Sequence, residues 1–220
     1  MKRRLLQTPA VGALGLLLTL SPGGAAAQTS NSVAGGASGA AVQTASGTLA
    51  PTPSAVLPLG GGRGAAQAAS VTVPGVLAAN ALSSSTTGVV GENAASAQGL
   101  AGASDVNILN GLITAKSVVA LASSASNGMR AGSNSIGSTI VALVVNGAPM
   151  GTLAPAPNTA IDIPGVGTMI LNEVTLGGDG VRSSSIRVNM IHVVLKNALT
   201  GAPTGDIAVG SASSSATFTR

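Results

Sequence analysis

The sequence predicts an all-β fold, namely a single antiparallel β-sandwich or barrel-like domain of about ten short strands. Apolar, β-branched runs recur along the chain and are separated by Gly, Pro and Asn. The turn residues agree, because Asn146-Gly147 suits a type I′ hairpin turn, and Pro74-Gly75 and Pro164-Gly165 offer the glycine that a type II turn needs at positive φ. Serine and β-branched residues crowd the same runs, which disfavours long helices.

The spacing of these runs predicts where the strands lie. We expect strands over residues 40–49, 54–57, 68–73, 76–86, 94–108, 113–124, 138–145, 159–163, 167–176, 185–196 and 206–217. Residues 140–145 are apolar at every position, which indicates a central strand covered on both faces. We expect Val141, Leu143, Val145, Ile170, Val193 and Leu195 to lie in the core.

One predicted strand changes its phase. Ile186, Val188 and Met190 share one face of a regular strand, whereas Ile191, Val193 and Leu195 share the other. Either the strand passes between two buried environments, or a β-bulge at Met190-Ile191 restores the phase.

The first residues have the pattern of a secretory signal peptide. Three basic residues precede an apolar stretch over 11–20, and Ala25-Ala26-Ala27 follows it. The stretch is short for a membrane span, so cleavage after Ala27 is preferred to a retained helix. We therefore expect a signal peptide over 1–27, a flexible Ser/Gly/Ala-rich N-terminus over 28–39 and a β-rich domain over 40–220, with a second flexible piece at 60–64.

Composition narrows the possible functions. The chain has no Trp, Tyr or Cys, one Phe and one His, so aromatic stacking on glycans or single-stranded nucleic acid is disfavoured. Its net charge of +4 includes three basic residues of the predicted signal; without them seven basic residues face six acidic ones, a net charge of +1. No basic cluster remains, so we expect neither nucleic acid as a partner nor a transmembrane segment in the mature chain.

A series of segments resembles a known family. In order, these segments are Ala103 to Ala115, Gly137 to Gly147, Pro157 to Gly167, Val188 to Val193 and Ile207 to Ala212. They resemble the choice-of-anchor P family of secreted bacterial proteins over roughly residues 40–217. The resemblance implies export and placement at the surface or outside the cell, and it carries no catalytic residues. Residues 207–220 contain no sorting motif of the kind that many members have.

Groups that could carry chemistry are few. His192 with Asp162, Asp206 and a serine could form a triad, but no G-x-S-x-G motif is present, and we expect His192 to bond a backbone carbonyl or to be exposed. Residues 105–111 resemble a calcium loop with misplaced ligands, so a turn with Asx hydrogen bonds is preferred. Glu173 and Asp179 could hold a hard cation, although solvated loop charges are the simpler interpretation. We predict no catalytic, cofactor-binding or metal-binding residues.

Two classes of function remain. The preferred one is a secreted, non-enzymatic structural protein of the cell surface or extracellular space, acting by association with itself or with cell-envelope components. The alternative is an extracellular binding or adhesion module, possibly assisted by calcium. The long uncharged run over 207–219 predicts that the C-terminal strand is the edge through which copies associate.

Overall fold

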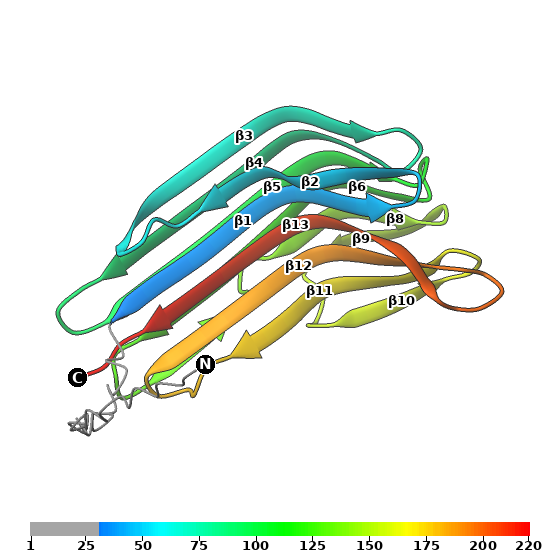
Figure 1. The fold of residues 1–220 in the computed structure, drawn as a ribbon. Coiled ribbons are helices and arrows are strands. Elements are labelled where there is room, and N and C mark those ends of the chain that lie inside the picture. Colours follow the sequence, from blue (N-terminus) through cyan, green and yellow to red (C-terminus); the bar gives the residue numbers. More distant parts are fainter. Residues whose placement is uncertain (1–30) are drawn as a thin grey trace, which may run out of the picture.

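A computed structural model describes residues 31–220, which form an all-β sandwich of thirteen antiparallel strands (Figure 1). The predicted signal peptide lies outside the described residues. The strands are β1 (Ser32–Thr44), β2 (Gly47–Val56), β3 (Gly61–Val73), β4 (Leu77–Val90), β5 (Ala95–Ile108), β6 (Ile113–Ser126), β7 (Ala131–Asn134), β8 (Thr139–Val145), β9 (Ala148–Leu153), β10 (Thr159–Ile163), β11 (Gly167–Gly177), β12 (Ser183–Lys196) and β13 (Pro203–Thr217).

The strands form two sheets that pack face to face. Sheet A has the order β10-β11-β12-β13-β1-β2, and sheet B has the order β3-β4-β5-β6-β8-β9, with β7 paired to the far end of β6. Most neighbours are consecutive hairpins, and the predicted turns make several of them. Asn146 and Gly147 both have positive φ between β8 and β9, as a type I′ turn requires, and Gly75 and Gly165 have φ values of 74° and 75°.

The predicted flexible segments are instead parts of strands. Residues 32–39 belong to β1, which pairs with β13 on one side and β2 on the other, so the prediction of a flexible N-terminus was wrong for them. Residues 61–64 begin β3. In both places glycine, alanine and serine gave no hydrophobic alternation, yet their backbone groups pair in ladders that do not need large side chains.

Two predictions of strand position were also wrong. The C-terminal strand β13 lies between β12 and β1, so it is not a sheet edge. The apolar strand β8 is second from the edge of sheet B, and Val141 on its outer face is 36% exposed. Of the six predicted core residues, Leu143, Val145 and Val193 are buried, whereas Ile170 and Leu195 are half-buried.

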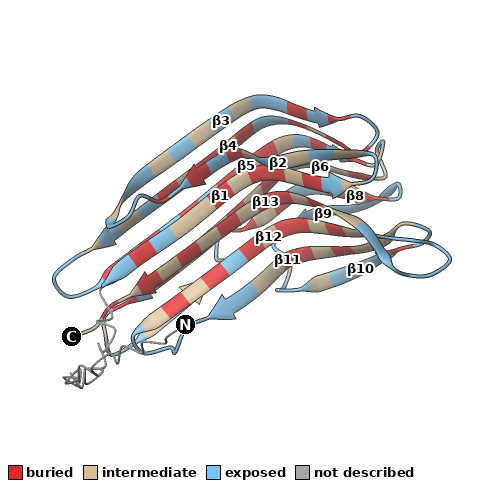
Figure 2. Cartoon of the chain, viewed as in Figure 1, coloured by how far each residue is buried: buried red, intermediate tan, exposed pale blue. Residues whose placement is uncertain are grey.

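The strands of sheet A bend together near their middle (Figure 1). In four adjacent strands two consecutive residues face the interior, and these pairs lie side by side across the sheet (Figure 2). The pairs are Gly39-Ala40, Val209-Gly210, Met190-Ile191 and Leu171-Asn172. The phase change predicted at Met190-Ile191 is therefore present. The register on either side is unchanged, so this is a bend shared by neighbouring strands and not a bulge in one strand.

Sheet B changes phase in the opposite way. In β4 and β8 the two consecutive residues point outward, at Asn80-Ala81 and Val141-Ala142. Ala81, Asp105 and Ala142 have positive φ, as do Asn172 and Gly210 on the bend of sheet A. In sheet A the two consecutive residues face inward, and in sheet B they face outward. Both sheets therefore bend in the same direction and stay packed against each other (Figure 1).

Small side chains let the two sheets approach closely. A Cβ atom at Gly99 of β5 would lie 2.7 Å from the carbonyl oxygens of both Gly36 and Ser213, on β1 and β13. The main core lies around the bend and extends to both sides of it. Its largest fully buried side chains are Leu77, Leu82, Ile108, Ile113, Ile140, Leu143, Met169, Leu171, Met190, Ile191 and Ile207.

Serines that face the interior are paired across the sheets. Ser124 Oγ of β6 lies 2.8 Å from Ser214 Oγ of β13 and 2.7 Å from Ser133 Oγ of β7. Ser184 Oγ donates to the Gly132 carbonyl at 2.9 Å. Because buried hydroxyls are costly only when they lack partners, these contacts explain how a serine-rich chain forms an interior.

Candidate functional site

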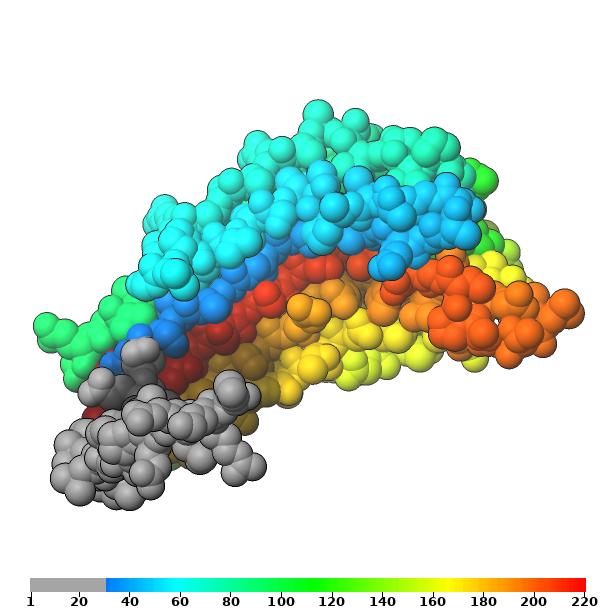
Figure 3. Space-filling model, viewed as in Figure 1, coloured from blue at the N-terminus to red at the C-terminus, as the bar shows by residue number. Residues whose placement is uncertain are grey.

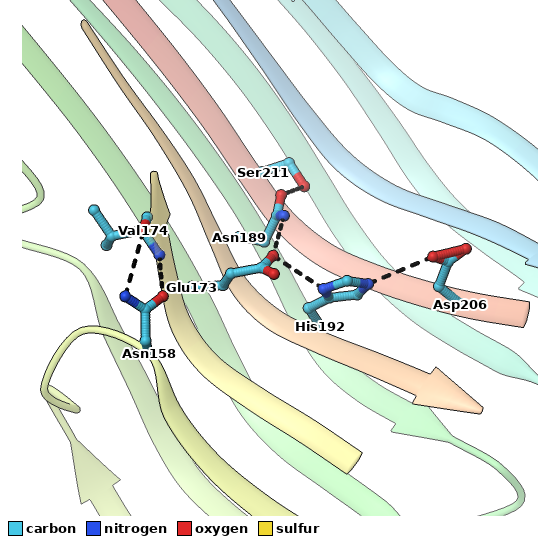
Figure 4. Close-up of polar contacts among 7 residues, drawn as sticks. All are labelled: Asn158, Glu173, Val174, Asn189, His192, Asp206 and Ser211. Carbon is cyan, nitrogen blue, oxygen red and sulfur yellow. Dashed lines mark hydrogen bonds and ion pairs between the residues drawn. The ribbon is translucent and has the colours of Figure 1, made fainter. Parts of the chain in front are cut away.

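A polar cluster crosses three strands on the outer face of sheet A (Figure 4). It contains Glu173 of β11, Asn189 and His192 of β12, and Asp206 and Ser211 of β13. The bend brings them together, because Met190 and Ile191 both point inward and leave Asn189 and His192 on the same outer face. Strand register brings the other members together, because Glu173 lies opposite Asn189 and Asn189 lies opposite Ser211.

Glu173 is the centre of the cluster. Its Oε2 accepts hydrogen bonds from Asn189 Nδ2 at 2.6 Å and from His192 Nδ1 at 2.9 Å. Asn189 Oδ1 in turn accepts from Ser211 Oγ at 2.8 Å. On the other side of the ring, His192 Nε2 lies 3.5 Å from Asp206 Oδ1. The side chains of Glu173 and His192 are 28% and 18% exposed, so the contacts are partly shielded from water.

The cluster is not a catalytic triad of the kind that His192, Asp162, Asp206 and a serine could have formed. Asp206 does lie beside His192, but Asp162 of β10 accepts a hydrogen bond from Thr168 Oγ1 at 3.0 Å and takes no part. Ser211 donates to Asn189, and among the described residues no serine hydroxyl bonds to His192. The expectation that His192 bonds a backbone carbonyl or is exposed was wrong. The ring lies between two carboxylates, and this arrangement ties β11, β12 and β13 together.

The other candidate residues lie near the end of β5 and in the loop after β11. Asn107 Oδ1 accepts from the Gly111 N–H at 2.7 Å, which confirms a turn with an Asx hydrogen bond, and Asp105 Oδ1 lies 3.6 Å from Lys116 Nζ. Glu173 and Asp179 do not share a site: Asp179 bonds its own loop after β11. Among residues 31–220, no group of three or more His, Cys, Asp or Glu side chains is placed to hold a metal ion.

Asp179 closes the loop between β11 and β12. Backbone N–H groups of Ser183, Val181 and Arg182 donate to its carboxylate and lower its pKa from 3.8 to about 2. The charged form therefore stabilises the folded loop above pH 3.8, and this contribution is lost as the pH falls through about 2.

We expect an NMR titration of Asp179 to give a midpoint near pH 2, with the amide signals of residues 181–183 following it. Asp179→Asn is the matched control, because it keeps an acceptor oxygen and removes the titration. Amide shifts in this loop that move equally in both proteins would contradict the assignment.

A shallow pocket of about 270 Å³ opens beside the polar cluster. It lies over β2, β1, β13 and β12, and small side chains line most of it. The polar side chains in its lining are Ser38, Ser54, Arg187, Asn189, Ser211 and Ser213. A pocket of this kind offers hydroxyl and amide groups and one guanidinium to a small polar ligand.

Four strands form the ends of the two sheets, and the four-residue β7 is a further short edge beside β6. The four end strands differ in how well they are protected against pairing with another strand. β10 has five residues and carries Asp162, β9 has six and carries Pro149, and β2 carries Pro51 and Pro53. β3 has thirteen residues, and after Arg63 it contains neither charge nor proline. Short length, charge and proline are the usual protection of an edge, so β3 is the edge that lacks it.

Comparisons with known proteins add little to this description. No protein-family model and no curated protein matches the chain. Among solved structures, the crystal structure of Neisserial surface protein A aligns with 86% of this chain and 97% of its own chain, at 12% identity and a TM-score of 0.17. A TM-score this low carries no argument about fold or function. The described residues contain no helix that is long and apolar enough to cross a membrane.

Proposed function

We propose that the mature chain is a non-enzymatic structural protein of the cell surface or extracellular space that acts by association. The observation that carries the proposal is the outer face of sheet A, which is lined by small, mostly uncharged side chains. On its central strands these are Ala34, Gly36, Ser38, Ala41 and Gln43 of β1, Asp206, Ala208, Ser211, Ser213 and Ser215 of β13, and Ser183, Ser185, Arg187, Asn189, His192 and Val194 of β12.

Such a surface offers little electrostatic repulsion between copies. Soluble monomeric proteins generally have a net charge well away from zero, and this chain would have a net charge of +1 after loss of residues 1–27. The signal-like start and the resemblance to a family of secreted proteins support export. The carboxylates on both sides of His192 support a structural role for the ring, since neither nitrogen faces a nucleophile.

The proposal is tested by locating the labelled full-length chain with immunogold electron microscopy in cells and medium, and by intact-mass analysis of the exported form. We expect label at the cell surface or in extracellular material, and a mature chain that begins at Gln28. Leu17→Arg, which interrupts the apolar stretch, is the control and should keep the label inside the cell. Label dispersed in the medium, on protein that sediments as a monomer at high concentration, would contradict the proposal.

The pocket beside the polar cluster favours one alternative, an extracellular binding or adhesion module. Arg187, Asn189 and Ser211 would contact the ligand, and association between copies would not be required. Monomeric, dispersed protein would make this alternative the better explanation.

A further inference from the structure

We propose that β3 is the contact strand, and that it pairs antiparallel with β3 of a second copy of this chain. This inference rests on the proposed function, because it assigns a place to the association. β3 is hydrogen-bonded to β4 on one side and forms the outermost strand of sheet B (Figure 1). In Figure 3 it runs along the upper rim of the molecule, coloured cyan to teal. An outermost strand presents a row of backbone N–H and C=O groups without ladder partners.

The half of β3 before the bend is suited to pairing with itself. The segment 64–69 has the sequence Gly-Ala-Ala-Gln-Ala-Ala, with no charge, no proline and no β-branched residue. Ala65, Gln67 and Ala69 face solvent, while Gly64, Ala66 and Ala68 are half-buried. Small side chains on both faces let a second backbone reach hydrogen-bonding distance, about 4.8 Å away, without collision.

Among the edge strands at the ends of the two sheets, β3 of a second copy is the best partner for β3. Two-fold antiparallel pairing places the same uncharged segment on both sides, which is the self-complementary arrangement of a closed dimer. Pairing with β2 or β9 of a second copy would meet prolines, which cannot donate to the ladder, and β10 is too short to cover the segment. The result of β3 pairing is one continuous sheet built from sheet B of both copies.

The first experiment adds charge to the edge. Ala65→Lys with Gln67→Lys places four lysines close together in the paired strands, and both positions are exposed, so the fold should be unaffected. We expect sedimentation equilibrium to show a dissociation constant raised at least about tenfold. Ser96→Lys with Gln98→Lys is the matched control: it adds the same charge at exposed positions of β5, a central strand, and should leave association unchanged.

The second experiment reports the geometry directly, because the chain has no cysteine of its own. Single cysteines are introduced in turn at Ala65, Ala66, Gln67 and Ala68, and the exported protein is oxidised. Only a residue close to the two-fold axis comes within the Cα separation of about 4.4–6.8 Å that a disulfide requires. We expect one position to cross-link far more than the others, and Gln98→Cys on β5 to cross-link little.

The outcomes separate this inference from the proposed function. If the unmodified protein associates but neither the lysines nor the cysteines at β3 have an effect, the β3 contact is overturned and association through another surface stands. Equal cross-linking at all four positions would indicate parallel pairing and would also overturn it. If the protein is monomeric yet remains at the cell surface, the partner is a different molecule and the inference fails alone. Monomeric protein dispersed in the medium overturns both.

Discussion

Truncation of Leu143 to alanine is expected to lower the free energy of unfolding by about 2–5 kcal/mol. Leu143 lies on the inner face of β8, is fully buried and belongs to the main core between the sheets. Removing its isobutyl group loses apolar burial and leaves a cavity that the strands cannot fill by collapsing, because their ladders hold them in place. Urea denaturation followed by circular dichroism gives the change directly.

Leu100→Ala is the matched control for Leu143→Ala. Leu100 lies on the outer face of β5 and is 36% exposed, so the same truncation should cost about 1 kcal/mol or less. Equal losses for the two variants would mean that the inner face of β8 does not lie in the core.

The second large effect is expected where the sheets are closest. Gly99→Ala should destabilise the protein by about 1–3 kcal/mol, although it adds only a methyl group. That methyl would lie 2.7 Å from two carbonyl oxygens, of Gly36 and Ser213, and both belong to backbone held in sheet A. Relief requires the sheets to separate locally, because neither oxygen can rotate away. Denaturant unfolding and the NMR signals of the packed strands would report it.

Gly132→Ala tests whether the cost at Gly99 comes from the contact or from the loss of glycine. Gly132 is a strand residue of β7, and a Cβ atom there would meet nothing within 4 Å. We expect a change within about 0.5 kcal/mol. If Gly99→Ala were equally mild, the close approach of the sheets would be wrong.

The sequence predicted the local features of the fold well. Strand 159–163 has the predicted bounds, and the strands that begin near residues 95, 113 and 167 start within one residue of prediction. The Asn146-Gly147 turn and the phase change at Met190-Ile191 were also predicted correctly. Each of these depends on short-range chemistry, namely positive φ at a turn or the alternation of apolar side chains.

The missed features depend on which strands pair across the fold. Residues 32–39 gave no alternation, yet β13, far away in the sequence, holds them in a sheet. The pairing of β13 with β1 is also why the C-terminal strand is central. The short strands β7 and β9 contain no buried residue, and they pair with β6 and β8, respectively.

The polar cluster was found only in part for the same reason. His192 and Asp206 were singled out from residue type, but Glu173, which bonds the ring, was assigned to the glycine loop. The missing information was register. Once Gly177 is known to pair with Ser185, Glu173 falls opposite Asn189, and the cluster follows from pairing alone.

The bend shared by the strands of sheet A fixes the register in which they pair. Straight strands rich in alanine and serine can slip by two residues at little cost, because every side chain still faces the same way. In sheet A a two-residue slip of β13 against β12 would move Gly210 out of line with Met190. Over the residues between the two displaced bends, one strand would then turn its apolar side chains outward. The bend thus penalises even-numbered slips as well as odd ones, which gives a low-complexity sequence a unique register without large side chains.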